Sequence, residues 1–259
     1  MKSDIKDRYC LVLEWLERIG KKTLEWFEKG TEIEWKPDHS PVTIADKEAE
    51  HELRELISEF FPNDGLLGEE FGDQQGSSGF RWIIDPIDGT RSFTRGIPMW
   101  AMLVGLEYRG QMVAGVAHAP ALGKTWHACK GEGAYVGDRR IQVSRQANLG
   151  PSQVYYSGLK WFQKAGVEEG FLRLSRECPQ LRGFGDFYGF VLVAQGSGEA
   201  MIEYGVKPWD IAALFPIIEE AGGKMTDWEG GVNLKRSDVL ASNGLVHEKT
   251  RQFFQGFKA

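Results

Sequence analysis

The stretch at residues 82–90 constrains the fold more than any other part of the sequence. An apolar run at 82–84 is typical of a short buried strand, and two acids, Asp85 and Asp88, follow it on either side of Pro86. Proline fixes its own φ, favours an extended conformation for the residue before it, and has no N–H for a ladder. We therefore expect the chain to leave a sheet at Pro86, with both carboxylates at the sheet edge.

Two carboxylates held this close predict a cation between them. Like charges at short range are costly unless one group is protonated or a cation neutralises both, and oxygen ligands suit Mg²⁺. Gly89 and Thr90 come next and supply a backbone that can bend closely around an anion, with a hydroxyl beside the acids. The motif thus indicates a metal together with a phosphate.

Composition narrows the class of partner. The chain has 259 residues, enough for one large domain or two intimately packed ones, and its 42% hydrophobic and 26% charged residues are typical of a globular protein. A formal net charge of −6 argues against nucleic acid as the main partner, because binding the phosphate backbone needs a concentrated basic face. A small anionic substrate is compatible with this charge if a cation mediates its binding.

Targeting signals are not apparent. Charged residues interrupt positions 1–20, so there is no apolar core of a signal peptide, and no run elsewhere approaches the length of a membrane span. We expect no membrane partner and a cytoplasmic location.

Periodicity predicts helices and antiparallel sheet in the first half. Helices are expected over 4–29 and 43–60, strands over 66–70, 82–84, 99–108, 111–118, 125–129 and 133–143, and loops over 34–43 and 71–79.

The second half alternates strands and helices after about Gly150. Strands are expected over 154–157, 181–184, 200–204, 224–227 and 239–242, and helices over 159–176, 187–195, 208–221 with a kink at Pro216, and 247–254. The alternation predicts layered α/β sheets in one compact unit. Within it, residues 1–149 form an N-terminal α+β part carrying the metal motifs, and residues 150–259 form a C-terminal α/β part carrying substrate specificity.

Acids recur where the predicted elements begin or end. Besides Asp85 and Asp88, these are Asp46 and Asp210 at helix starts and Glu69 at a strand end. Taken singly, an aspartate at a helix start is usually a cap and a Glu–Glu pair is usually solvated. The informative fact is that five such positions occur in one chain.

Three ordered motifs identify a family. Gly-Glu-Glu at 68–70, Asp-Pro-Ile-Asp-Gly-Thr at 85–90 and Lys-Pro-Trp-Asp-Ile-Ala-Ala at 207–213 resemble the inositol monophosphatase family of Mg²⁺-dependent, lithium-sensitive phosphatases. Pro-Val-Thr-Ile-Ala-Asp at 41–46 is similar to the family's segment before its second helix, so the resemblance covers nearly the whole chain. It implies an αβαβα sandwich and a homodimer.

The resemblance also implies a role for each motif residue. Two to three Mg²⁺ ions are expected on Glu69, Asp85, the carbonyl of Ile87, Asp88 and Asp210. Asp46 and Thr90, with Glu69, would orient the attacking water, and backbone amides around Gly89 and Thr90 would hold the phosphate. The physics agrees, because a carboxylate cluster would repel a phosphate dianion unless cations neutralise both. Attack by a metal-activated water needs no covalent intermediate.

The second half departs from the inositol-specific pattern. Residues 182–187, Arg-Gly-Phe-Gly-Asp-Phe, resemble the histidinol-phosphatase branch of the family, as do residues 91–98 and the short spacing from Glu69 to Asp85. An acid at Asp186 suits a substrate with an ammonium group, whereas a polyol needs neutral partners. The alternative is that Asp186 only caps the helix expected from Phe187.

Four further positions have predicted roles or alternatives. Glu203 matches the family position that contacts the non-phosphate part of the substrate. Arg182 is expected either to contact substrate or phosphate, or to form a salt bridge at a subunit interface. Lys36 and Ser40 lie in the loop that the family uses as a mobile metal-binding flap, although the sequence alone favours a solvated lysine.

The expected activity is hydrolysis of L-histidinol phosphate to L-histidinol and phosphate, a step of histidine biosynthesis. Inositol-1-phosphate is the main alternative substrate, ahead of fructose-1,6-bisphosphate and a 3′(2′),5′-bisphosphate nucleotide. A non-catalytic, metal-dependent binding protein on the same fold is a further alternative. The intact set of acids argues against it, because a retired enzyme would be expected to have lost at least one.

Overall fold

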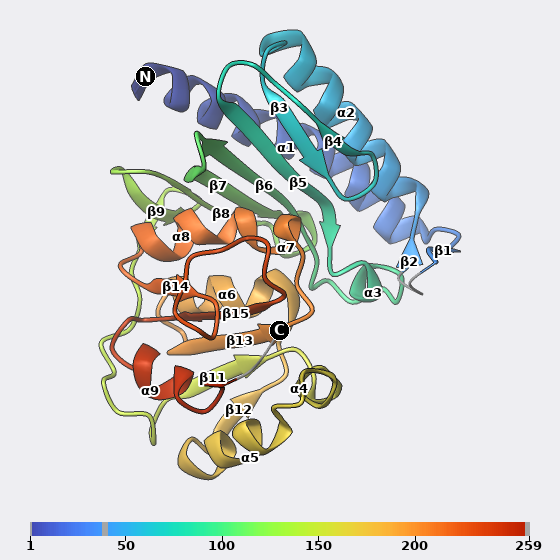
Figure 1. The fold of residues 1–259 in the computed structure, drawn as a ribbon. Helices are drawn as coiled ribbons and strands as arrows, with labels where there is room; N and C mark the ends of the chain where they lie inside the picture. Colours follow the sequence, from blue (N-terminus) through green and yellow to red (C-terminus); the bar gives the residue numbers. More distant parts are fainter. Residues whose placement is uncertain (1, 38–40, 257–259) are drawn as a thin grey trace.

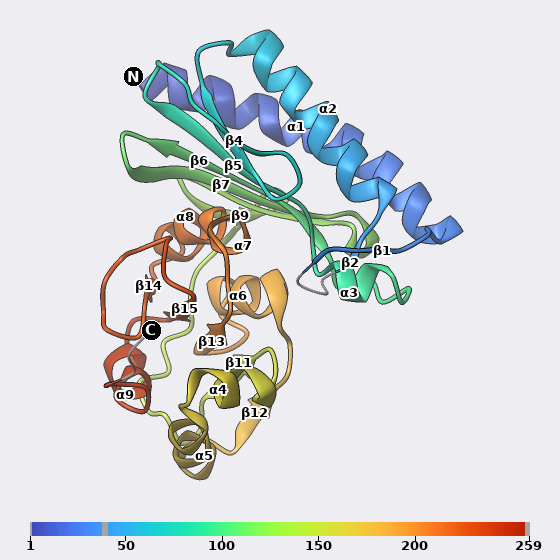
Figure 2. The ribbon, with the colours of Figure 1, turned by 45° about the vertical axis from the view of Figure 1, so that its right-hand side comes forward.

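Five layers alternate between helices and sheets in the computed structural model, which describes residues 2–37 and 41–256. Helices α1 (Lys2–Lys29) and α2 (Ile44–Phe60) cover the outer face of the first sheet (Figures 1 and 2). The middle layer contains α6 (Asp186–Ala194), α7 (Pro208–Ala212) and α8 (Leu214–Glu220). Helices α4 (Leu159–Ala165), α5 (Glu168–Glu177) and α9 (His247–Arg251) lie outside the second sheet.

The first sheet comes from the first half of the chain. In the part of the chain that the structure describes it has eight strands in the order β10-β9-β8-β7-β6-β5-β3-β4. Its strands are β3 (Gly65–Gly68), β4 (Gly72–Gln74), β5 (Phe80–Asp88), β6 (Ala101–Tyr108), β7 (Gln111–Ala119), β8 (Lys124–Cys129), β9 (Gly133–Val136) and β10 (Arg139–Ile141). All neighbours are antiparallel except β3 and β5, which are parallel and so end at the same edge.

The second sheet has five strands over the described residues, in the order β12-β11-β13-β15-β14. They are β11 (Gln153–Tyr156), β12 (Gln180–Arg182), β13 (Ala200–Tyr204), β14 (Lys224–Thr226) and β15 (Asp238–Ser242). The chain therefore changes sheet between β10 and β11. Because α7 and α8, from the second half, pack on strands of the first sheet, the two halves share the middle layer. The division into two parts at 149/150 stays a prediction.

Three apolar cores fill the spaces between the layers. One joins α1 and α2 to the first sheet, and a second lies between the sheets around the apolar helix α6. The third joins α4, α5 and the residues that flank α9 to the second sheet. In the described residues, no helix is long and apolar enough to cross a membrane. The predicted αβαβα layering is confirmed.

Several predicted element boundaries were wrong. The 34–43 segment contains the short paired strands β1 (Glu34–Trp35) and β2 (Pro41–Val42), and the predicted 71–79 loop contains β4. The predicted 159–176 helix is two helices, since Gly166 ends α4 in the left-handed conformation. The predicted 208–221 helix breaks at Ala213, and Pro216 lies in the first turn of α8, where its missing N–H costs nothing. Helix α9 ends at Arg251, before the predicted limit.

Candidate active site

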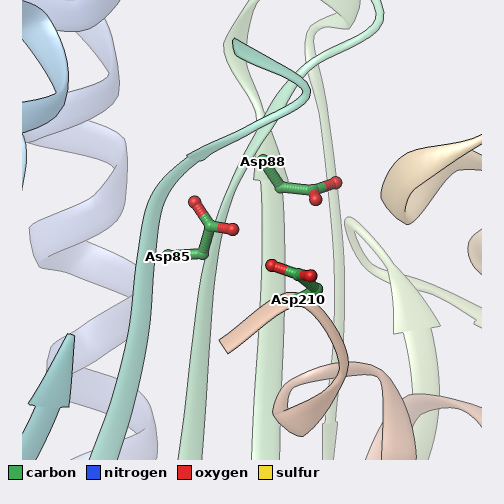
Figure 3. Close-up of side chains that lie close together, drawn as sticks. All are labelled: Asp85, Asp88 and Asp210. Atoms are coloured by element: carbon green, nitrogen blue, oxygen red, sulfur yellow. The ribbon is translucent and has the colours of Figure 1, made fainter. Parts of the chain in front are cut away.

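Three carboxylates converge where β5 ends and α7 begins. Asp85 and Asp88 come from β5 and Asp210 from the first turn of α7. Their side chains point toward one another (Figure 3), and one oxygen from each lies within 4.8 Å of the others. Asp85 and Asp88 are buried and Asp210 is half-buried.

A bulge in β5 brings the two aspartates of this strand together. Asp85 pairs with Leu103 and Asp88 with Ala101, and the register shifts between these pairs. The strand therefore has one extra residue within Pro86–Ile87. A bulge is one of the few places in a sheet where proline is tolerated. The expectation that the chain leaves the sheet at Pro86 was therefore wrong, because the strand resumes through Asp88.

Backbone amides hold each carboxylate in place. Asp88 Oδ2 accepts a hydrogen bond from Phe187 N at 2.6 Å, and Asp85 Oδ1 accepts one from Ile87 N at 3.1 Å. Asp210 Oδ2 accepts one from Lys207 N at 2.7 Å. The orientations are thus fixed by the fold, as a preformed metal site requires.

The electrostatics of this cluster call for a cation. Burial raises the pKa of Asp85 and of Asp88 well above the usual range, and repulsion from neighbouring acids adds to it. Burial also raises the pKa of Asp210 to about 7. Within residues 2–37 and 41–256, no lysine or arginine forms an ion pair with any of the three. A donor set made only of carboxylate oxygens fits a hard divalent cation.

Glu69 lies just beyond β3, next to the cluster, and is paired with a lysine. Lys36 Nζ is 2.7 Å from Glu69 Oε1 and 2.6 Å from Glu70 Oε1. Although burial opposes the charge of Lys36, these two hydrogen bonds raise its pKa above the ordinary value. The prediction of a solvated lysine was wrong. Ser40 lies outside the described residues.

Asp46 uses its two oxygens differently. Its Oδ2 accepts hydrogen bonds from Thr43 N at 2.8 Å and Thr43 Oγ1 at 2.7 Å, which caps α2. Its Oδ1 faces Thr90, whose hydroxyl lies 3.4 Å away and also donates to the carbonyl of Ile87 at 2.9 Å. Burial raises the pKa of Asp46 to about 7, against the Thr43 hydrogen bonds. Asp46 is therefore both a cap and a group able to exchange a proton near neutral pH.

Gly89 forms the turn between β5 and the short helix α3 (Thr90–Phe93). Its φ is +85°, and an added Cβ would lie 2.9 Å from the Met99 carbonyl oxygen and 3.4 Å from Asp186 Oδ2. Only glycine adopts this conformation without strain and leaves this space open. Gly89 thus places the first amides of α3 beside the carboxylates.

A second pair of acids lies behind the first cluster. Glu203, on β13, is 7% exposed and its Oε2 has no hydrogen-bond partner among the described residues. Together with Asp186, Asp88 and Asp210 it lines a small recess of about 30 Å³. Burial raises the pKa of Glu203 well above its usual range, and the nearby Asp186 adds to this.

Asp186 is the first residue of α6, and its side chain lines the cavity. Gly185, not Asp186, is the N-cap, so the alternative that Asp186 only caps this helix was wrong. Its φ of +56° is unusual for a residue with a side chain, and such backbone strain tends to occur at functional sites. Asp186 touches the solvent of the cavity although protein surrounds it. This partial desolvation raises its pKa, while Arg91 lowers it.

All these groups open into one cavity of about 690 Å³. Of the predicted site residues, Glu69, Asp85, Ile87, Asp88, Gly89, Thr90, Asp186 and Asp210 line it, and Glu203 lines the recess behind it. Arg182 does not line this cavity. It is exposed on the edge strand β12, where its Nη1 donates to the Leu181 carbonyl at 2.9 Å. Its alternative role at a subunit interface stays a prediction.

The far wall of the cavity was not predicted. It contains Trp161 and Lys164 from α4, Tyr204 and Gly205 from the end of β13, and Lys207 and Trp209 from the start of α7. Lys207 and Trp209 lie inside a quoted motif, so their neighbour Asp210 could have pointed to them. Nothing in the local sequence around Trp161 separates it from an ordinary surface tryptophan.

The arrangement fits a reaction at a phosphate ester. The acid cluster can hold divalent cations, Asp46 and Thr90 can exchange a proton, and the turn at Gly89 can receive an anion. The recess with Asp186 and Glu203 suits a positively charged group.

Comparison with known proteins identifies the family of the chain. The model of the inositol monophosphatase family matches residues 8–256. A histidinol-phosphatase from Chlorobaculum parvum is 40% identical over 237 residues, which are 91% of this chain and 90% of that protein. A histidinol-phosphatase from Mycobacterium tuberculosis is 39% identical over 222 residues, 84% of this chain and 85% of that protein.

A solved structure agrees with the fold. An IMPase from Thermotoga maritima matches with a TM-score of 0.86 at 29% identity, covering 95% of this chain and 96% of that one. The predicted family and enzyme class are thereby confirmed: this chain belongs to the inositol monophosphatase family and is a metal-dependent phosphoric monoester hydrolase.

Proposed function

We propose that this protein is a Mg²⁺-dependent histidinol-phosphatase that hydrolyses L-histidinol phosphate to L-histidinol and phosphate. The observation that carries the proposal is the pair Asp186 and Glu203, which lies next to the metal-type carboxylates. A substrate with an ammonium group would supply the positive charge that this pair calls for. The relatives named histidinol-phosphatase support the same substrate.

Glu69, Asp85, Asp88, Asp210 and the Ile87 carbonyl would hold two to three Mg²⁺ ions per site. When bound, Mg²⁺ neutralises the carboxylates and the phosphate and acidifies a water molecule, which makes it a nucleophile near neutral pH. Lys36 Nζ occupies Oε1 of Glu69, so a cation would bind this carboxylate through Oε2 or displace the ammonium from Oε1.

Asp46 and Thr90 would orient the water and take up its proton. The Thr90 hydroxyl can accept a proton from the water while passing its own to Asp46 Oδ1, which it faces at 3.4 Å. Because burial raises the pKa of Asp46 to about 7, this carboxylate accepts a proton more readily than an ordinary aspartate. The hydroxyl has one proton, and the nearer acceptor is the Ile87 carbonyl at 2.9 Å, so the relay requires this proton to turn from Ile87 to Asp46.

The turn at Gly89 would receive the phosphate. Of the amides around this turn, those of Ser92 and Phe93 donate to the Gly89 carbonyl, so the amides of Gly89 and Thr90 are the ones that would hold the phosphate. This places the phosphate at the Gly89 turn and the amino alcohol beside it, at the recess that Asp186 and Glu203 share with Asp88 and Asp210. An uncharged polyol would leave Glu203 without a cation and Asp186 with the nearby Arg91 alone among the described residues, which disfavours inositol-1-phosphate.

Phosphate release tests the proposal directly. The purified protein with Mg²⁺ is given histidinol phosphate, inositol-1-phosphate, fructose-1,6-bisphosphate or adenosine 3′,5′-bisphosphate in parallel, with and without a chelator. We expect the highest kcat/KM for histidinol phosphate and loss of turnover on chelation. Preference for inositol-1-phosphate would overturn the substrate assignment, and lack of turnover of all four would favour a binding protein.

We also propose a homodimer located in the cytoplasm. The exposed Arg182 on edge strand β12 is a candidate for an ion pair across the subunit interface. Light scattering coupled to size-exclusion chromatography should give about twice the 29.1 kDa chain mass, and Arg182→Ala should weaken the dimer. A monomer at all concentrations would contradict this part of the proposal.

A further inference from the structure

The far wall of the cavity contains a tryptophan, Trp161, that has no role in the proposed hydrolysis. Trp161 lies on α4 and lines the cavity that Asp88 and Asp186 also line. It is 36% exposed, although it is among the largest apolar side chains of the chain. An exposed aromatic ring inside a binding cavity is available to pack against a bound ligand.

The position of the indole is fixed by a glycine. Gly205 follows β13 with a φ of +92°, and a Cβ there would lie 2.9 Å from Cζ3 and 3.0 Å from Cε3 of Trp161. The amides of Gly205 and Val206 donate to the Ser237 carbonyl at 2.7 and 3.2 Å, which holds this turn in place. The ring therefore rests directly on a fixed backbone segment, in an orientation that a side chain at 205 would disturb.

A cation already lies over this ring. Lys164 Nζ, one helical turn after Trp161, is 5.1 Å from the centroid of the indole. Indole is the best aromatic partner for cations, because its face carries negative charge. Since the ring rests on Gly205, a flat, electron-poor or cationic group would stack on the face that Lys164 covers and would displace its ammonium.

Buried residues on the opposite side of α4 hold the helix against the protein core, and Trp161 is not needed for this. Phe162 is 1% exposed and stacks on Phe171 and Trp228, and Ala165 is also buried. Replacing Trp161 should therefore leave the fold intact, so its role can be tested on a folded enzyme.

We infer that Trp161, seated on Gly205, is a specificity-determining residue that stacks on the heteroaromatic ring of the substrate. This inference rests on the proposed function, because L-histidinol phosphate carries an imidazole at the end away from the phosphate. Imidazole is flat and becomes cationic near its pKa of about 6.5, which are the two properties that an indole face recognises. Asp186 and Glu203 then bind the ammonium, and Trp161 binds the ring.

Two variants of Trp161 separate this role from a structural one. Trp161→Phe keeps an aromatic face, whereas Trp161→Leu removes it, and Leu159→Ala changes a neighbouring exposed residue of α4 outside the cavity. Each is assayed with Mg²⁺ on histidinol phosphate and on phosphoethanolamine, which has the amine and the phosphate but no ring. Binding of L-histidinol and of ethanolamine is measured by calorimetry on the same proteins.

Stacking on an aromatic side chain predicts about a tenfold higher KM for histidinol phosphate in Trp161→Leu, with kcat little changed. L-histidinol should bind more weakly by a similar factor, while both ligands without a ring are unaffected. Trp161→Phe should keep most of the affinity, and Leu159→Ala should match the wild type. Equal losses on phosphoethanolamine, or no loss on histidinol phosphate, would overturn the inference while the proposed function stands. If the wild type itself does not hydrolyse histidinol phosphate, the proposed function fails and this inference with it.

Discussion

The two ends of the active-site cavity are built in different ways. At the metal end, Asp85 and Asp88 are buried within one strand, and backbone amides hold them and Asp210 in place. At the recognition end, Asp186, Glu203 and Trp161 come from α6, β13 and α4, and two of these three side chains touch the solvent of the cavity. At the metal end, two of the three aspartates lie three residues apart in one strand, whereas the three side chains of the recognition end all come from different, distant segments.

This difference indicates a division of labour. A metal site needs fixed oxygens, since small displacements of its ligands weaken binding and catalysis. A recognition site needs complementary charge and shape, and exposed side chains can change with little cost to the fold. Substitutions at the metal end should therefore stop the reaction for every substrate, whereas those at the recognition end should change the preferred molecule.

Asp88→Asn should have the largest effect. It removes one charge from the cation-binding cluster, so kcat should fall by at least about a thousandfold on every phosphate ester. Without metal, however, the variant should be at least as stable as the wild type, because it relieves repulsion among buried acids. Thermal unfolding should show that Mg²⁺ stabilises the wild type but not the variant. A variant that remains active, or gains as much stability from Mg²⁺ as the wild type, would break the comparison at the metal end.

Gly89→Ala should come next. The added Cβ would lie 2.9 Å from the Met99 carbonyl oxygen in a backbone conformation that disfavours side chains. We expect a loss of stability of about 1–3 kcal/mol and a fall in kcat/KM of about ten- to a hundredfold, similar for all substrates. Denaturant unfolding and steady-state kinetics would measure both. Gly96→Ala is the matched control, since Gly96 also has a positive φ but a Cβ there meets no atom within 4 Å. Equal activity losses in both variants would indicate a general effect of strain.

The metal end could be predicted from the sequence because its geometry is local. Asp85 and Asp88 are three residues apart in one motif, so they are close in any fold, although the bulge that brings their carboxylates together depends on pairing with β6. Asp210 needed the family resemblance, because only the tertiary fold brings α7 to β5. Even here the bulge at Pro86 was missed, since proline ends a strand in most contexts and only the pairing with β6 shows that the strand resumes.

The recognition end could be predicted only in part. The sequence indicated Asp186 and Glu203 through the resemblance, but Trp161 reaches the cavity only because β13 turns at Gly205 beneath it. The pairing of Lys36 with Glu69 and Glu70 was likewise invisible, because their strands lie more than thirty residues apart. Strand β4 was taken for a loop, since it is exposed throughout and has no apolar alternation.

A smaller expected effect is a loss of folding stability at acid pH, to which one histidine in each half of the molecule should contribute. Burial lowers the pKa of His118, in strand β7 of the first sheet, and of His247, in α9 outside the second sheet, to about 4 in each case. Below about pH 6.5 these histidines are protonated in the unfolded chain but stay neutral in the fold, so stability falls as the pH drops from 6.5 towards 4. We expect a loss on the order of 1 kcal/mol for each histidine at pH 5, measured by denaturant unfolding without metal.

Single variants would assign this loss. His247 hydrogen-bonds Thr226 and Ser242 at 2.9 and 2.8 Å, so His247→Gln lowers stability at every pH but should flatten the dependence between pH 6.5 and 5. An unchanged slope would show that other groups dominate the acid loss.

The central claim is tested most directly by the substrate preference of two proteins, the wild type and Asp186→Asn. For each protein, kcat/KM for histidinol phosphate is divided by kcat/KM for inositol-1-phosphate. If the metal end sets the reaction and the recognition end sets the molecule, the ratio should favour histidinol phosphate in the wild type. In the variant it should fall about tenfold, through KM for the aminated substrate, with inositol-1-phosphate turnover unchanged. An unchanged ratio, or an equal loss on both substrates, would contradict the account.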